Sequence, residues 1–291
     1  MTSTIGAAPE AVEEVVADLC RQARERYALP MVGVSVIASG LIGFTAIPAQ
    51  KARLDQVVAA AWPGARTRIL VLASRRARLL ARPREQVLDI WRHPRSGDPE
   101  GVLERATQLL PGDPPAEVVA FRGSSLLVRA PGQALGWLDR DGDFTLEAPS
   151  SRPATPGPGS PWDAAVVLGV ALSHLGEPYI WGGTGGGGFD CSGLIWRSFL
   201  TAGVLLPKHS RQQRLLGRRA ARREMLPGDL VAAVSRGPRR TSHVALAITQ
   251  EEVVHACSER GEVRREPLAD FQRRYRILTV RRLQGEMGSD R

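Results

Sequence analysis

The residue best suited to chemistry is Cys191, which lies where a glycine-rich loop meets an expected helix. The loop spans residues 179–190, and glycine accepts positive φ and close backbone approach. After it, Leu194, Ile195 and Phe199 recur at helical spacing. A cysteine at a helix N-terminus faces unpaired N–H groups and the positive end of the helix dipole, which stabilise the nucleophilic thiolate. The pattern therefore predicts a nucleophile, with a plain core cysteine as the alternative.

Two histidines downstream have the types and spacing of a base and its orienting partner. The segments 241–248 and 252–256 are expected to be successive strands joined by a short turn, with His243 in the first and His255 in the second. A hairpin places these side chains next to each other. A lone histidine is more often structural. A pair on adjacent strands, downstream of a helix-capping cysteine, indicates a catalytic set.

The stretch from Tyr179 to Leu194, the Leu-Pro-Gly-Asp-Leu segment at 226–230 and the two histidines resemble the NlpC/P60 family of papain-like cysteine peptidases. The resemblance covers roughly residues 162–282 and implies a catalytic domain of helices packed on an antiparallel sheet. It also implies a cysteine endopeptidase of peptidoglycan stem peptides, cutting the γ-D-glutamyl–diamino acid bond in cell-wall turnover or recycling. No cofactor or metal is implied, and free muropeptides are the expected partners.

The same resemblance assigns roles to individual positions. Cys191 is the implied nucleophile, His243 the base, and His255 the third residue that orients the base. Residues implied to stabilise the oxyanion or to bind substrate are Tyr179, Trp181, Asp190, Ser192 and Ser210. Tyr179 resembles the family tyrosine beside the nucleophile, and Ser210 the serine that helps to hold the D-glutamyl carboxylate.

Composition excludes little and favours no nucleic-acid partner. The chain has 291 residues and a formal net charge of +9, and nearly all of its basic excess is arginine. The basic residues are scattered, without aromatic interleaving or a zinc or helix-turn-helix signature, so nucleic-acid binding is not predicted. A basic surface is equally consistent with anionic substrates. Three cysteines without a pairing motif fit a reducing compartment.

No segment of the sequence is expected to target or anchor the protein. Residues 1–10 lack a positively charged start, and the following apolar positions are interrupted by acids. The longest apolar run, 31–48, is broken by glycine and serine and is expected to be a hairpin, so no membrane span is predicted. The interpretation is a cytoplasmic protein, with export by another route left open and the oligomeric state undetermined.

The first unit predicted is a small α+β domain over residues 1–73. Its pattern is helix, two strands, helix and strand, with a turn at Ser39-Gly40 and a proline at each later junction. This order resembles a BON domain, which implies attachment to wall, membrane or ligand. No residue in the segment indicates catalysis.

Residues 74–148 are turn-rich, with short apolar runs that predict a small β-barrel. They resemble the bacterial SH3-like domain that precedes NlpC/P60 domains. That resemblance implies that Asp113 binds the free amino terminus of a stem peptide, although Ala134 replaces the tyrosine expected beside it. A Pro/Gly/Ser linker at 149–161, the catalytic domain at 162–285 and a tail at 286–291 complete the chain.

Several other readings compete with the peptidase. Cys191, His243 and His255 are legitimate zinc ligands, so a zinc-dependent hydrolase is one alternative. A non-catalytic module that binds wall peptides is another, and acyl transfer or cleavage of a small amide is a third. Gly183, Gly185 and Gly188 satisfy G-x-G-x-x-G, but no long strand precedes them, so a phosphate-binding loop is not predicted.

Overall fold

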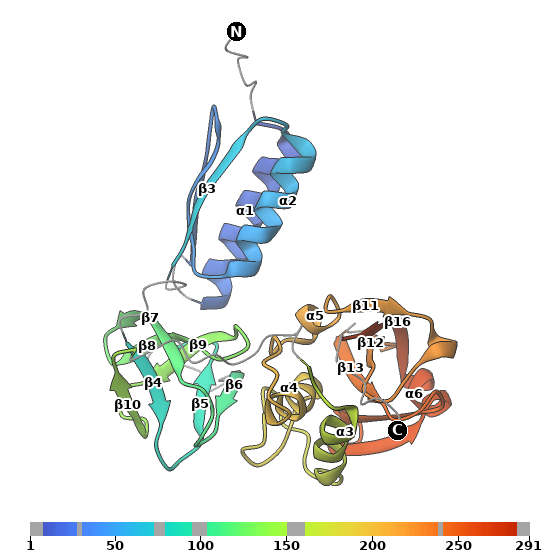
Figure 1. The fold of residues 1–291 in the computed structure, drawn as a ribbon. Helices are drawn as coiled ribbons and strands as arrows, with labels where there is room; N and C mark the ends of the chain where they lie inside the picture. The colour runs from blue at the N-terminus through green and yellow to red at the C-terminus, as the bar shows by residue number, and fades with distance from the viewer. Residues whose placement is uncertain are drawn as a thin grey trace.

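The computed structural model describes residues 8–27, 31–72, 79–94, 104–149, 161–237 and 241–283, and leaves the side chains of 24–27 undescribed. The structure is a mixed α+β protein of three units (Figure 1). Almost all of the predicted linker and the whole predicted tail lie outside the described residues. Within the described residues, no helix has the length and apolar character needed to cross a membrane.

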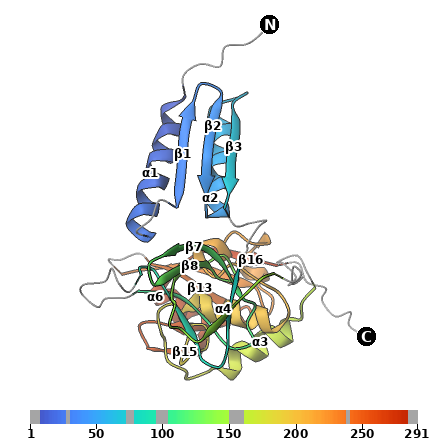
Figure 2. The ribbon, with the colours of Figure 1, turned by 90° about the vertical axis from the view of Figure 1, so that its left-hand side faces the viewer.

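The N-terminal unit is a three-stranded sheet with two helices side by side on one face (Figure 1). Its elements are, in chain order, α1 (Glu10–Tyr27), β1 (Val32–Ile37), β2 (Gly40–Thr45), α2 (Pro48–Ala61) and β3 (Arg66–Val71). β1 and β2 form an antiparallel hairpin, and α2 crosses over so that β3 joins β2 in parallel. The predicted element order is confirmed, while the resemblance to a BON domain stays a prediction. Figure 2 shows this unit standing above the rest of the molecule.

The middle unit is one seven-stranded sheet in the order β10-β4-β7-β8-β9-β5-β6. Its strands are β4 (Leu80–Pro83), β5 (Leu88–Trp91), β6 (Arg105–Leu109), β7 (Ala116–Arg122), β8 (Ser125–Arg129), β9 (Leu135–Asp139) and β10 (Phe144–Glu147). The end strands β10 and β6 do not pair within the described residues, so the closed barrel that was predicted is not found. Gln108 on β6 instead bonds to the loop before Cys191. The resemblance to an SH3-like domain stays a prediction.

The C-terminal unit packs helices on a six-stranded antiparallel sheet in the order β11-β16-β12-β13-β14-β15, as predicted. Its helices are α3 (Ala164–Ser173), α4 (Cys191–Thr201), α5 (Ser210–Gln213) and α6 (Leu268–Arg274), with a 3-10 turn at Arg222–Glu224. Its strands are β11 (Arg218–Ala220), β12 (Leu230–Ser235), β13 (Ser242–Ala247), β14 (Glu252–Cys257), β15 (Glu262–Pro267) and β16 (Tyr275–Arg282).

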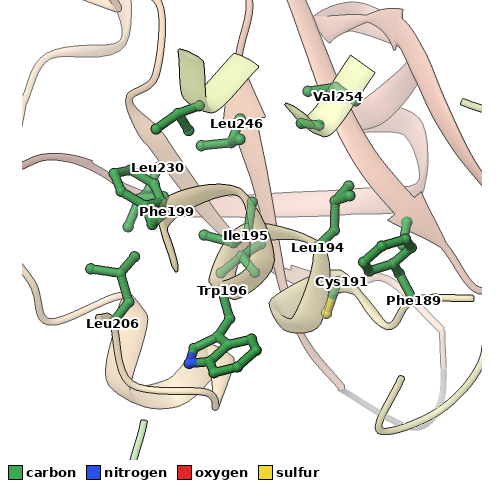
Figure 3. Packing of buried hydrophobic residues seen from close by; sticks show 14 of the residues in the cluster. Phe189, Cys191, Leu194, Ile195, Trp196, Phe199, Leu206, Leu230, Leu246 and Val254 are labelled. Atoms are coloured by element: carbon green, nitrogen blue, oxygen red, sulfur yellow. The ribbon is translucent and has the colours of Figure 1, made fainter. Parts of the chain in front are cut away.

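One apolar cluster holds α4 against this sheet (Figure 3). Buried side chains of the helix meet side chains of β12, β13 and β14 there, among them Leu194, Ile195, Phe199, Leu230, Leu246 and Val254. Burying an aliphatic or aromatic side chain of this size stabilises the fold by roughly 1.5–3 kcal/mol. Cys191 lies at the edge of the cluster, so packing of α4 fixes the position of the thiol relative to the strands.

A buried arginine joins the N-terminal unit to the middle unit. Arg129 on β8 is 4% exposed, and its Nη2 donates to the carbonyl oxygens of Ala46 at 2.5 Å and Leu72 at 2.7 Å. Its Nη1 pairs with Glu117 at 2.9 Å. Apolar side chains from both units pack around this contact, including Met31, Val32, Leu127, Leu135 and Trp137. The two units therefore share a core.

The middle unit is joined to the C-terminal unit by hydrogen bonds and an ion pair. Arg197 on α4 pairs with both carboxylate oxygens of Asp113, at 2.6 and 2.9 Å. Thr184 donates its backbone N–H to Gln108 Oε1 at 3.1 Å. Gly132 has φ +78, and a Cβ there would lie 2.6 Å from Trp196 Nε1, so only glycine fits this contact. These contacts bring all three units around one cavity.

Candidate active site

Cys191 is the first residue of α4, in agreement with the helix pattern. Asp190 caps the helix by accepting the N–H of Gly193 at 2.5 Å, and it also accepts the N–H of Gly182 at 3.0 Å. A Cβ on Gly193 would lie 1.9 Å from the Gly183 carbonyl oxygen, so glycine lets the loop pack directly on the first turn. The helix therefore begins where the loop ends, with the thiol at its N-terminal end (Figure 3).

Asp190 also forms a buried ion pair that the sequence did not reveal. Lys208 Nζ lies 3.0 and 2.9 Å from the two carboxylate oxygens, and the lysine is 1% exposed. Ser192 Oγ donates to Asp190 Oδ1 at 2.9 Å. Removing one partner of such a pair leaves an uncompensated buried charge, at a cost of about 3–5 kcal/mol. The loop, the helix start and the segment before α5 are thereby tied together.

The surroundings of Cys191 favour the neutral thiol over the thiolate. Burial raises its pKa to about 12, and the negative charge of Asp190 acts in the same direction. Hydrogen bonds from the Val244 and Ser192 backbone and the charge of Lys208 oppose this rise only in part. The thiolate expected at a helix terminus is therefore not the resting form, because desolvation of a side chain only 7% exposed outweighs the helix dipole. This thiol needs a base.

His243 and His255 come together on adjacent antiparallel strands, as the hairpin pattern predicts. β13 and β14 pair with Leu246 opposite Val254. His243 Nε2 lies 2.8 Å from His255 Nδ1, with the rings perpendicular. His255 is fully buried, and its Nε2 lies 2.9 Å from Glu266 Oε1 on β15. A chain of hydrogen bonds thus runs across three strands.

Glu266 determines which nitrogen of each ring carries the proton. Burial would raise the pKa of Glu266, but hydrogen bonds from His255 and Arg274 lower it to about 2, so it is an ionised acceptor. His255 Nε2 therefore donates to Glu266, and in a neutral ring Nδ1 then accepts from His243 Nε2. His243 Nδ1 is left with a free lone pair for the Cys191 thiol. Arg274 holds the carboxylate by donating to Glu266 Oε2.

Aromatic packing keeps the His243 ring in this orientation. Tyr275 stacks on it, with centroids 4.1 Å apart and an interplanar angle of 9°. Cys257 Sγ lies 3.8 Å from the Tyr275 hydroxyl and is fully buried. Cys257 is therefore a buried small residue packed against Tyr275, and it does not line the cavity that Cys191 lines.

A cavity of about 570 Å³ opens above Cys191 and His243. Its walls come from α1 and α2 of the N-terminal unit, from the middle unit, and from the loop, α5 and β13 of the C-terminal unit. The predicted site residues that line it are Tyr179, Trp181, Asp190, Cys191, Ser192, Ser210 and His243. His255 lies behind His243, outside the lining, as an orienting residue must.

The sequence of residues 176–282 matches the model of a known protein family, the NlpC/P60 family. This chain contains an NlpC/P60 domain. The matched segment holds the glycine-rich loop, α4 and all six strands of the C-terminal sheet, and thus the hydrogen-bonded histidines. The mixed α+β fold and the presence of an NlpC/P60 domain, both expected from the sequence, are confirmed, while the domain boundaries stay a prediction.

Relatives of this NlpC/P60 domain include peptidases of two kinds. A probable endopeptidase of Mycobacterium tuberculosis is 36% identical over 110 residues, which is 38% of this chain and 28% of that protein. A gamma-D-glutamyl-L-lysine dipeptidyl-peptidase of Bacillus cereus is 33% identical over 91 residues, covering 31% of this chain and 27% of its own. The chain thus spans well under half the length of these relatives.

Among solved structures, an NlpC/P60 family protein from Bacillus cereus is similar over 70% of this chain and 62% of its own. The sequence identity is 24% and the TM-score 0.40. The P60 domain of an antigen from Mycobacterium avium subspecies paratuberculosis is 30% identical over 36% of this chain and 84% of that domain, with a TM-score of 0.31.

One predicted site residue of the NlpC/P60 protein lies elsewhere. Asp113 does not line the cavity, and both of its carboxylate oxygens are held by Arg197. It also accepts the Leu110 N–H at 2.8 Å, which closes the turn between β6 and β7. The expected role as acceptor of a substrate ammonium is therefore replaced by a structural one, because a guanidinium already occupies the carboxylate.

We expect Asp113→Asn to lower stability and leave substrate affinity almost unchanged. Asp113 is 4% exposed, and loss of its charge leaves Arg197 without its counter-ion, at a cost of roughly 3–5 kcal/mol. A lower midpoint in thermal unfolding with the same KM is the expected result. The control is Asp141→Asn, an exposed turn aspartate of the middle unit. A raised KM with unchanged melting would restore the substrate-binding role.

Sequence reasoning missed Glu266, Arg274 and Lys208. Glu266 and Arg274 lie in an arginine-rich stretch that resembles any charged surface segment, and only strand pairing turns Glu266 toward His255. A signal did exist for Lys208, since it is one of two lysines in an arginine-rich chain and lies two residues before Ser210. A buried cation needs a partner, and Asp190 is that partner.

Proposed function

We propose that the protein is a cysteine peptidase that hydrolyses peptidoglycan stem peptides at the γ-D-glutamyl–diamino acid bond, in turnover or recycling of the cell wall. The single observation that carries the proposal is the hydrogen-bonded line from His243 through His255 to Glu266, which begins in the cavity that Cys191 also lines. Relatives named as peptidoglycan endopeptidases and as gamma-D-glutamyl-L-lysine dipeptidyl-peptidases support the choice of substrate.

In the proposed mechanism His243 acts as a general base. Its Nδ1 takes the thiol proton as Cys191 Sγ attacks the carbonyl carbon of the scissile amide. The resulting imidazolium is stabilised through His255 by the ionised Glu266. It then returns the proton to the leaving amine, and a water activated by the same ring hydrolyses the thioester. In this mechanism the thiol loses its proton to His243 as it attacks, so no thiolate has to form beforehand.

The oxyanion formed in this step needs donors at the helix start. The backbone N–H of Cys191 at the first position of α4 is one such donor. Tyr179 is a second: burial and the neighbouring Cys191 and Asp190 raise the pKa of its hydroxyl, so it stays protonated and can donate. Both residues line the same cavity as His243.

A zinc-dependent hydrolase fits the side chains less well. Zinc binding by Cys191, His243 and His255 requires a ring lone pair from each histidine. In His255 one nitrogen donates to Glu266 and the other accepts from His243, so no lone pair remains. Within the described residues, no group of three or more histidine, cysteine or acidic side chains is placed to hold a metal.

The decisive experiment digests purified muropeptides and synthetic stem peptides, with mass spectrometry of the products. We expect cleavage between γ-D-glutamate and the diamino acid, and unchanged rates after addition of a chelator. Products cut at another amide would correct the assigned bond. Loss of activity with chelator, restored by zinc, would establish the metal alternative. Binding of the peptides without cleavage would leave the non-catalytic module.

The acid limb of the pH–rate profile should lie well below pH 6.5. Burial lowers the pKa of His243 far below its usual value, and the neighbouring His255 and the positive charge of Arg274 act in the same direction. The base therefore stays neutral as pH falls through 6.5, and kcat/KM is lost only when the pH reaches the lowered pKa. Initial rates between pH 4 and 8 measure this. An acid limb centred at 6.5 or above would contradict a buried neutral base.

A further inference from the structure

The cavity above Cys191 has an unusual charge balance. Among the described residues, the side chains that line the cavity include one carboxylate, Asp190, and two arginines, Arg92 and Arg211. Arg92 pairs with Glu104 at 2.5 Å, so part of its charge is balanced from outside the lining. The Arg211 side chain is exposed, and its guanidinium has no hydrogen-bond or ion-pair partner among the described residues.

Asp190 cannot serve as a counter-ion for a substrate cation. Its Oδ1 accepts from Gly193 N–H, Ser192 Oγ and Lys208 Nζ, and its Oδ2 accepts from Gly182 N–H and Lys208 Nζ. These five hydrogen bonds use the lone pairs of the carboxylate, and Lys208 already neutralises its charge. An ammonium that entered the cavity would meet a filled carboxylate and the charge of Arg211, which has no counter-ion among the described residues.

The remaining polar wall is neutral. Carboxamides line it from all three units: Gln22 and Gln50 from the N-terminal unit, Gln133 from the middle unit and Gln212 from the C-terminal unit. The oxygen of Gln50 accepts from Thr45 Oγ at 2.9 Å, which leaves its amide N–H groups available as donors. Carboxamides offer both donors and acceptors, and they supply no charge to balance an ammonium.

We propose that this cavity selects stem peptides whose amino end is acylated and whose carboxylates are free, with α1 and α2 of the N-terminal unit forming part of the substrate wall. This inference rests on the proposed function and narrows its substrate class. Of the two kinds of peptidase among the relatives, it places the chain with the endopeptidases, since a dipeptidyl-peptidase must accept a free ammonium. Acylated stems are those still attached to glycan, so turnover fits better than recycling of free peptides.

The experiment compares L-Ala-γ-D-Glu-L-Lys-D-Ala with its N-acetyl derivative, which differs only at the amino end. We expect kcat/KM for the N-acetyl peptide to be higher, by about tenfold, which corresponds to about 1.4 kcal/mol. Two substitutions test the cause. Arg211→Gln should reduce the ratio of kcat/KM for the N-acetyl peptide to kcat/KM for the free peptide, because it removes a cation that repels the ammonium. Gln50→Glu should reduce the same ratio by adding a carboxylate to the cavity wall.

Matched controls carry the same charge changes away from the cavity. Arg214→Gln lies on the exposed side at the end of α5, and Gln56→Glu lies on the exposed side of α2. Both should leave the ratio unchanged. Equal or faster cleavage of the free peptide by the native protein would overturn the proposal. An equal shift from Gln50→Glu and Gln56→Glu would overturn the role of the N-terminal unit.

A binding measurement tests this inference independently of the proposed function. Calorimetry with Cys191→Ala protein and the two peptides reports selection by the cavity in the absence of chemistry. Tighter binding of the N-acetyl peptide supports the inference even if neither peptide is cleaved by the native protein, in which case the peptidase assignment fails alone. Tighter binding of the free peptide overturns the inference even if the expected bond is cut.

Discussion

Cys191→Ala should abolish hydrolysis of stem peptides, with kcat falling by about 10⁴-fold or more, because no other group can form the acyl-enzyme. The thiol lies at the start of α4 and lines the cavity with His243. Burial raises its pKa to about 12, so we expect attack to require proton transfer to the base. Stopped assays with product quantification by mass spectrometry measure the loss, and circular dichroism checks the fold.

Cys257→Ala is the matched control for the nucleophile. Cys257 is fully buried against the Tyr275 hydroxyl and does not line the cavity. We expect it to retain most of the activity and to lose stability through the small void left behind. Activity that survives in Cys191→Ala and disappears in Cys257→Ala would reverse the assignment of the nucleophile.

His255→Ala should lower kcat by roughly 10²-fold or more while the protein stays folded, since it removes both the partner of His243 and the link to Glu266. His255→Asn and His255→Gln should retain more activity. A carboxamide can accept from His243 Nε2 with its oxygen and donate to Glu266 with its nitrogen. Measured kcat values, with melting midpoints as the control, order the three variants.

A substitution of Glu266 tests whether this residue orients the base or only contributes to packing. Glu266→Gln keeps the volume but puts an amide N–H where either His255 Nε2 or Arg274 must donate, so one contact is lost. We expect kcat to fall about 10- to 100-fold, the range seen when a partner that orients a functional histidine is removed. The pH–rate profile should move as well. If Glu266→Gln lowers the stability of the protein but leaves kcat and the pH–rate profile unchanged, the role of Glu266 is purely structural.

The sequence alone was sufficient for features set by local spacing. Glycine followed by a 3.6-residue apolar pattern placed Cys191 at the start of a helix, and two β-branched segments around a short turn placed His243 and His255 on adjacent strands. These signals are short in range, since the backbone within ten to fifteen residues determines them. Together with the flanking motifs they identified the NlpC/P60 domain.

Tertiary structure decided everything that depends on distant partners. Asp113 lies at a sequence position where a substrate-binding acid is expected. In the structure, however, Arg197, 84 positions later, pairs with both of its carboxylate oxygens. The closed barrel predicted for residues 74–148 is not found among the described residues, where β10 and β6 end the sheet unpaired with each other and the Gln108 side chain on β6 accepts from Thr184. Hydrogen-bond partners so far apart in sequence leave no periodic pattern to read.

Burial had the largest effect on the chemistry. The helix dipole argues for a Cys191 thiolate from sequence, but desolvation depends on how closely α4, β13 and the loop pack around the sulfur, and it raises the pKa instead. Likewise, Glu266 became the end of the histidine relay only through pairing of β14 with β15. The sequence determined which residues are candidates for catalysis, and three-dimensional packing decided which of their protonation states is favoured, because the pKa of a side chain depends on its burial and on the neighbouring charges.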